Sequence, residues 1–161
     1  MTQNALMTAV LTGIRDARPI SDAAERLATW ERCWTERSEP PYFGTAYSRA
    51  SGALVPIPET ELEFLDVLRT QLFARYLGDV SEVSEFGCGL GTNLAPLLGS
   101  GKRLRGFDWS PAATTKARAS GIDAEYFDMF HPHEVGLSGA VLTVHALEEL
   151  GDRWRPVLQF L

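Results

Sequence analysis

The sequence is poor in cysteine and contains no long hydrophobic run. Only Cys33 and Cys88 occur among its 161 residues, so neither a disulfide framework nor a cysteine-rich metal site is expected. No stretch approaches the ~20 consecutive apolar residues of a membrane-spanning helix. The first basic residue is Arg15, and threonines interrupt the apolar residues before it, which does not match a secretory signal. These absences predict a cytoplasmic protein that has no contact with membranes.

Basic residues are also scarce. The chain carries 15 lysines and arginines against 21 aspartates and glutamates, for a net charge of -6. Binding to a phosphate backbone needs a basic face, so nucleic acid is not an expected partner. A neutral or cationic small molecule, or a sugar, fits this charge better. The length and the ordinary share of hydrophobic and charged residues predict about one globular domain.

The first eighty residues predict a helical preface. Apolar residues at helical spacing predict one helix over 6–14, and a second helix begins near Asp22. Trp30 and Trp34 form an apolar ridge on this second helix, which we interpret as core. Residues 38–58 are rich in proline and glycine and predict a loop. This loop is either a lid over a ligand pocket or a connector that packs on the sheet.

A third helix is predicted to begin at a Thr60–Glu63 capping box and to end at Gly78. Its sequence predicts a buried stripe formed by Leu62, Leu65, Leu68 or Arg69, Leu72, Phe73 and Tyr76.

Residues 80–94 predict a short strand, a turn with Gly87, Gly89 and Gly91, and the start of a helix. Three closely spaced glycines indicate a backbone that turns tightly or that a ligand approaches closely. Asn93 stands near where the third glycine of a nicotinamide-binding turn would fall, so an oxidoreductase is disfavoured. A glycine-rich turn in some other α/β protein is the alternative. We interpret Cys88 as a small filler of this turn.

Two acidic residues then follow two predicted strands. Asp108 ends the strand 104–107, and Ser110-Pro111 opens the next helix. A carboxylate about 20 residues beyond such a glycine turn accepts hydrogen bonds from ribose hydroxyls; the alternative is an aspartate that caps its loop. Trp109 either lies against an adenine or seals the pocket. Asp128 ends the strand 124–127 in the same manner.

The most continuously apolar run, 139–145, predicts a fourth strand, which ends at His145, and a last helix covers 154–161. The alternation of strands and helices predicts a parallel sheet whose carboxyl ends carry the ligand site. His131 and His133 lie in a loop without further metal ligands at suitable spacing, so no metal site is predicted.

Together these motifs resemble class I S-adenosylmethionine (SAM)-dependent methyltransferases over residues 80–150. The resemblance implies a Rossmann-like three-layer α/β sandwich with a parallel sheet of order 3-2-1-4, without strands 5–7 and with an N-terminal helical extension. It divides the chain into a helical or lid segment, 1–58, and an incomplete SAM-binding domain, 59–161. The residues that it implies for SAM binding are Glu85, Gly87, Cys88, Gly89, Gly91, Asn93, Asp108, Trp109, Asp128, Met129 and His145.

The implied reaction is methyl transfer from SAM to a small-molecule acceptor. The runs 127–130 and 143–148 further resemble enzymes that act on sugars or natural products. Within the resemblance, Asp128 bonds the adenine amino group and the Met129 backbone meets the ring. His145 and then Glu148 are the candidate catalytic bases; alternatively, His145 only orders the pocket and Glu148 only stabilises a helix start.

Two expectations concern the state of the protein. Because the fourth strand would be left as an apolar edge, the chain is expected to be either a truncated product or an oligomer that pairs with another copy there. The alternative function is a catalytically silent SAM-binding, nucleoside-binding or scaffold protein.

Overall fold

A computed structural model describes residues 23–36, 45–48, 53–56 and 59–161 of the chain. The helix predicted over 6–14 lies outside these residues. Among the helices that are described, none combines the length and the apolar character needed to cross a bilayer.

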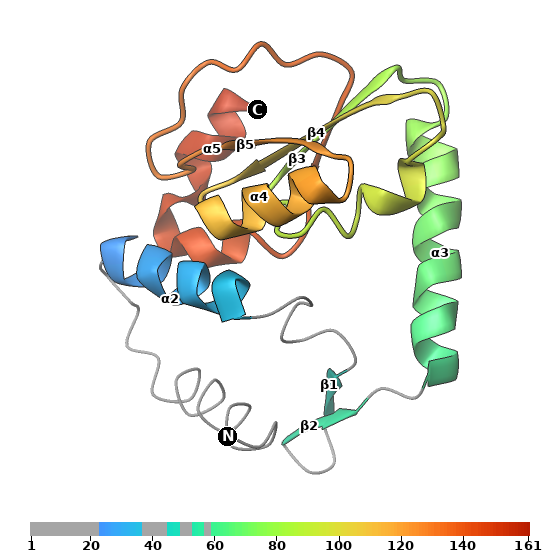
Figure 1. The fold of residues 1–161 in the computed structure, drawn as a ribbon, viewed down its shortest axis with the longest axis horizontal. Coiled ribbons are helices and arrows are strands. Elements are labelled where there is room, and N and C mark those ends of the chain that lie inside the picture. Colours follow the sequence, from blue (N-terminus) through green and yellow to red (C-terminus); the bar gives the residue numbers. More distant parts are fainter. Residues whose placement is uncertain (1–22, 37–44, 49–52, 57–58) are drawn as a thin grey trace.

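The domain is built around one parallel sheet of four strands (Figure 1). These are β3 (Glu82–Phe86), β4 (Arg103–Asp108), β5 (Asp123–Tyr126) and β6 (Ala140–Thr143). Their spatial order is β5-β4-β3-β6, and every neighbouring pair is parallel. When the four strands of this sheet are numbered 1 to 4 along the chain, their spatial order is 3-2-1-4. The predicted Rossmann-like α/β arrangement is therefore confirmed.

Each face of the sheet has its own apolar core, because side chains alternate between the two faces along every strand. On one face Val83, Leu104 and Ala124 pack beneath α4 (Pro111–Ala119) and beside the end of α3 (Glu59–Leu77). On the other face Phe86, Phe107 and Phe127 pack against η2 (Leu147–Arg153) and α5 (Trp154–Phe160). The Phe86 and Phe107 rings stack with centroids 4.6 Å apart. Helical layers on both faces give the predicted three-layer sandwich.

The central strand β3 is unusually polar for its position, yet all five of its residues are buried. The charge of Glu82 is balanced by two arginines of β4. Arg103 Nη1 lies 3.1 Å from Glu82 Oε2, and Arg105 Nη1 lies 3.7 Å from Glu82 Oε1. Arg105 also donates to Glu125 Oε1 at 2.7 Å and to the carbonyl oxygens of residues 135 and 136. Arg105 therefore joins three strands to the loop that leads into β6.

The two arginines make a matched pair for a stability measurement, because the Arg105 side chain is 7% exposed and the Arg103 side chain is 60% exposed. Arg105→Met should lower the free energy of unfolding by about 3 kcal/mol, since it leaves Glu82 and Glu125 without a buried counter-charge. Arg103→Met should cost less than about 1 kcal/mol, since its own guanidinium is exposed and Arg105 remains beside the buried Glu82. Urea denaturation measures both; equal losses would contradict the role given to Arg105.

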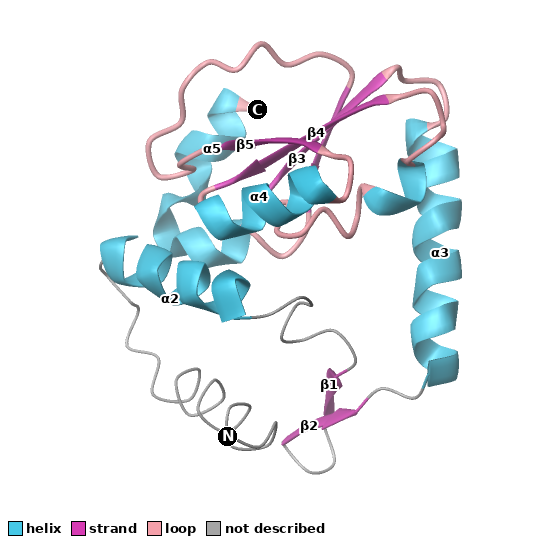
Figure 2. Cartoon of the chain, in the orientation of Figure 1, coloured by secondary structure: helices cyan, strands magenta, loops and turns pink. Residues whose placement is uncertain are grey.

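The prediction of a loop throughout 38–58 is wrong in part. Two short strands, β1 (Thr45–Ser48) and β2 (Ala53–Pro56), pair antiparallel within it (Figure 2). Local pairing satisfies backbone donors and acceptors that an irregular loop would leave to water. The rest of the range lies outside the described residues.

The helix predicted after the glycine turn is also shorter than expected. Only the 3₁₀ turn η1 (Ala95–Leu97) forms. Pro96 cannot donate a backbone hydrogen bond, and Gly99 and Gly101 follow with φ angles of 79°, which end helical geometry. A helix dipole at this turn therefore contributes nothing to the site.

The buried stripe predicted on α3 is wrong in part. Phe73 and Leu77 pack on the core, whereas Leu68, Leu72 and Tyr76 are exposed. The capping box and the stop at Gly78 indicate where a helix begins and ends, but not what its apolar face contacts. The side chains of Leu62 and Leu65 lie outside the described part of the structure.

Candidate functional site

The glycine turn after β3 is the backbone centre of the site. Gly87, Gly89 and Gly91 all have positive φ angles, of 75°, 52° and 78°. A Cβ on Gly87 would lie 2.2 Å from the Cβ of Ala146, well inside contact distance. The turn therefore needs glycine both for its conformation and for its close packing against the segment after β6.

Asp108, at the end of β4, is fixed against this turn. Its Oδ2 accepts the Gly89 N–H at 2.8 Å, and its Oδ1 accepts the Ser110 N–H at 2.9 Å. Burial raises the pKa of Asp108 above its ordinary value, and these two hydrogen bonds oppose that shift. A carboxylate offers about four acceptor positions, so roughly two remain for a ligand that donates two hydrogen bonds.

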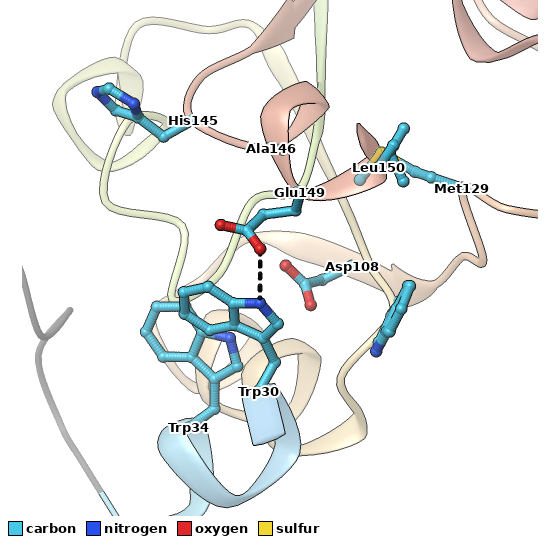
Figure 3. A pocket seen from close by; sticks show the side chains of 10 residues that line it. Trp30, Trp34, Asp108, Met129, His145, Ala146, Glu149 and Leu150 are labelled. Carbon is cyan, nitrogen blue, oxygen red and sulfur yellow. Dashed lines mark hydrogen bonds between the residues drawn. The ribbon is translucent and has the colours of Figure 1, made fainter. Parts of the chain in front are cut away.

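A cavity opens beside Asp108, between the sheet and α2 (Ala23–Glu36) (Figure 3). Its volume is about 70 Å³, below the roughly 300 Å³ at which ligand pockets begin. The described residues that line it include two carboxylates and three indoles, and neither lysine nor arginine. They are Trp30, Trp34, Gly87, Asp108, Trp109, Met129, His145, Ala146, Glu149 and Leu150.

The helix α2 is fastened over the cavity by polar contacts to α4. Both oxygens of the Glu31 carboxylate accept the Ala112 N–H at 3.2 Å, and one also accepts the Ser110 hydroxyl proton. A carboxylate here compensates the free N–H groups and positive dipole at the start of α4. The Lys116 ammonium donates to the Trp34 carbonyl oxygen. The position of α2 therefore depends on these polar contacts as well as on apolar packing.

The tryptophan pair of α2 has two roles. The Trp30 and Trp34 rings stack with centroids 5.8 Å apart. Trp34 is buried and packs within reach of Gly89, which agrees with the interpretation as core. Both tryptophans also line the cavity, where Trp30 Nε1 donates to Glu149 Oε2 at 3.4 Å (Figure 3). Sequence reasoning missed Trp30 and Glu149 as site residues, although the tryptophan spacing had marked the helix face.

His145 lies at the rim of the cavity in an unusual backbone conformation. Its φ angle is 55°, a left-handed value that few residues other than glycine adopt. The side chain is exposed and points away from Asp108 and Glu149 in Figure 3. The side chain of Glu148 lies outside the described part of the structure, and the carboxylate that lines the cavity belongs to its neighbour Glu149.

Glu85 and Asn93 lie behind the turn and away from the cavity lining. Asn93 Nδ2 donates to Glu85 Oε1 at 2.6 Å, and Arg69 Nη1 of α3 donates to Asn93 Oδ1 at 3.1 Å. Burial raises the pKa of Glu85 to about 8, although the Asn93 hydrogen bond opposes this. Cys88 and Gly91 are buried as well, and burial raises the pKa of the Cys88 thiol. These four residues, which the sequence had predicted to bind SAM, therefore do not line the cavity.

Asp128 borders a second hollow, next to the first. Its Oδ1 accepts the Phe130 N–H at 2.8 Å, and its Oδ2 lies 2.8 Å from His131 Nδ1. Trp109 lines both hollows, and its buried Nε1 has no hydrogen-bond partner among the described residues. The described residues contain no cluster of metal ligands. The structure thus brings Gly87, Asp108, Trp109, Met129 and His145 to one cavity, with Asp128 on the far side of Trp109.

Comparison with known proteins finds similar solved structures but no matching family model and no matching curated sequence. One is the SAM-bound amino pentose methyltransferase of calicheamicin biosynthesis from Micromonospora echinaspora, with 19% identity, a TM-score of 0.49, and coverage of 81% of this chain and 48% of that one. Another is the geranyl diphosphate C-methyltransferase of Streptomyces coelicolor, solved with S-adenosyl-L-homocysteine (SAH), with 20% identity, a TM-score of 0.49, and coverage of 84% and 60%. A third is a sugar N-methyltransferase from Streptoalloteichus, with 20% identity, a TM-score of 0.44, and coverage of 59% and 42%.

These structural neighbours are methyltransferases, the class that the sequence motifs resemble. The chain spans about half the length of the neighbours that it matches, from 42% to 60% of the three described.

Proposed function

We propose that the protein binds SAM beside Asp108 and transfers its methyl group to a small-molecule acceptor, such as the sugar or natural product implied by the sequence motifs. The observation that carries this proposal is the geometry of Asp108. Two backbone N–H groups of the turn and of the α4 start hold its carboxylate in place, and its remaining acceptor positions are available to two vicinal hydroxyls. A ribose presents such a pair of hydroxyls.

The other walls of the cavity fit the remaining parts of SAM. Trp109 Nε1, which has no partner in the part of the chain that the structure describes, supplies a donor. Trp109 and Met129 supply apolar surface for a flat ring. The face of an indole attracts a cation, so Trp30 suits the positively charged sulfonium. Glu149 adds negative charge on the same side. Asp128, beyond Trp109, is our proposed partner for the adenine amino group.

When bound, SAM supplies an electrophilic methyl group. The chain then has to orient an acceptor in line with it and exclude water. For a hydroxyl or ammonium acceptor, a proton must also be removed. His145 at the rim is our proposed base; turning its ring towards the cavity would place it there. Glu149 is the second candidate, because its carboxylate already lines the cavity.

Because the cavity of about 70 Å³ is too small for a nucleoside, we propose that α2 moves outward to admit SAM and closes again over it. The sequence left a lid role open for the N-terminal segment 1–58, and we propose that α2 performs this role. A second candidate function is SAM or nucleoside binding without transfer; the exposed His145 side chain, which points away from Asp108 and Glu149 in Figure 3, favours it.

Separate calorimetric titrations with SAM, SAH and NAD test the proposal. SAM and SAH should bind with micromolar dissociation constants and NAD should not bind. Methyl transfer from labelled SAM to a panel of amino sugars and hydroxylated natural products then separates the enzyme from the silent binder. Absence of SAM binding would refute both functions.

Comparison of Trp30→Ala with its control, Trp154→Ala, tests whether SAM binds in this cavity. Trp154 is partly exposed on α5 and does not line the cavity. Loss of the Trp30 indole should weaken SAM binding about 10-fold and SAH binding less, since only SAM carries the positive charge. Trp154→Ala should change neither affinity. Equal effects of the two variants would place the ligand elsewhere.

A further inference from the structure

One helix of the domain exposes an apolar surface that the proposed function does not use. Along α3 the described side chains with large exposed apolar area are Phe64, Val67, Leu68, Leu72 and Tyr76, which are between 44% and 68% exposed. Four of them recur every four residues, so they form one continuous ridge. We call these five residues the α3 ridge. Figure 1 shows α3 at the side of the domain, with its N-terminal half extending beyond the sheet.

The size and continuity of the α3 ridge indicate an interface. Single exposed apolar residues are common, but monomeric proteins rarely expose contiguous apolar patches of many large side chains. Burial of such side chains is worth roughly 1.5–3 kcal/mol each. The sheet does not provide this burial, because only Phe73 and Leu77 of the described α3 side chains pack on its core.

The charges of α3 indicate what covers the ridge. The N-terminal half of the helix carries acidic residues and no basic one, whereas the C-terminal half carries basic residues and no acidic one. The acidic residues are Glu59, Glu61, Glu63 and Asp66, and the basic ones are Arg69 and Arg75. This order stabilises the helix itself through its dipole. It also makes an antiparallel second copy complementary, since the exposed Glu63 of one copy would approach the exposed Arg75 of the other; Arg69 is already bound to Asn93.

We propose that the α3 ridge is the interface of a homodimer in which two α3 helices pack antiparallel about a twofold axis. A twofold interface requires a self-complementary surface, and the ridge is one. With the axis near residue 70, Phe64 faces Tyr76 of the second copy and Leu68 faces Leu72, and each contact occurs twice. This interface differs from the outer edge of β6, where the sequence had predicted pairing.

Sedimentation equilibrium of the full chain tests the proposal. At about 100 µM chain in low salt, the protein should sediment at twice the chain mass. The double variant Leu68→Glu/Leu72→Glu should raise the dimer dissociation constant at least about 100-fold, because four carboxylates would then meet at the centre of the interface. Both side chains are exposed, so the circular dichroism of this variant should match that of the wild type, as should its thermal melting at chain concentrations where both are monomeric.

The matched control is Leu158→Glu, at a residue of α5 with a similar exposed fraction of 48%; it should leave the dissociation constant unchanged. Raising the salt concentration should weaken the dimer, since the complementary halves of α3 are screened. A wild-type chain that remains monomeric at 100 µM overturns the proposal. A dimer that survives the double variant, as pairing through β6 would, also overturns it.

Discussion

Replacing Asp108 with asparagine is expected to weaken SAM binding about 1,000-fold, equivalent to ~4 kcal/mol. Hydrogen bonds to a charged group contribute about 1.5–3 kcal/mol each, and the proposed ribose makes two of them. The amide also turns a donor towards one of the two backbone N–H groups that now reach the carboxylate, Gly89 or Ser110. Isothermal titration calorimetry with SAM and with SAH measures the loss.

The control is Asp123→Asn, the same chemical change at a carboxylate that is 62% exposed on β5; its affinity for SAM should equal that of the wild type. Thermal melting separates lost binding from lost folding. A second measurement needs no variant, because the wild-type chain should bind a 2′,3′-dideoxy analogue of SAH far more weakly than SAH itself. Equal binding of the two ligands, or an unchanged affinity of Asp108→Asn for SAM, would show that Asp108 does not bind the ribose.

Glu85 is expected to make stability strongly dependent on pH. Burial raises the pKa of its carboxyl from 4.5 to about 8, so folding favours the protonated form. The resulting stability is fully present below pH 4.5 and is lost as the pH rises to about 8. Each pH unit between these values costs about 1.4 kcal/mol, which gives a loss of up to about 5 kcal/mol.

Glu85→Gln should abolish this dependence, since an amide does not ionise and its oxygen can still accept from Asn93. Urea denaturation between pH 5 and pH 9 should show the wild type losing stability relative to this variant as the pH rises. Glu134→Gln, at an exposed loop position, should follow the wild-type curve. If the wild type and Glu85→Gln kept parallel curves, Glu85 would be ionised in the folded state throughout this range.

Much of the fold was predictable because local chemistry determines it. The spacing of Gly87, Gly89 and Gly91 predicts a turn with positive φ angles, which all three residues adopt. Strands that alternate with helices predict a parallel sheet, and acids at strand ends predict where side chains converge. Asp108 meets the turn directly through Gly89. These inferences needed only short-range patterns and the geometry of parallel sheets.

The remainder depends on contacts between distant segments, which no local pattern encodes. Glu31 holds the α4 start from 79 residues away, and this contact brings Trp30 to the cavity. The neighbours Glu148 and Glu149 are equivalent in the sequence, and only packing after β6 turns Glu149 inward. The apolar spacing of α3 likewise indicates a helix with an apolar side, but whether that side meets the sheet or a second molecule is decided by tertiary and quaternary structure.

The contact between Gly87 and Ala146 has a consequence for engineering ligand choice. Since a Cβ on Gly87 would collide with the Cβ of Ala146, the residues that follow β3 and β6 are closely packed and tolerate little substitution. The opposite side of the cavity is formed by α2, which is held in place by polar contacts such as those of Glu31 to Ala112 and of Lys116 to Trp34. Randomising the face of α2 that lines the cavity is therefore the most direct route to new ligand selectivity, since it leaves Asp108, the proposed ribose ligand, unchanged.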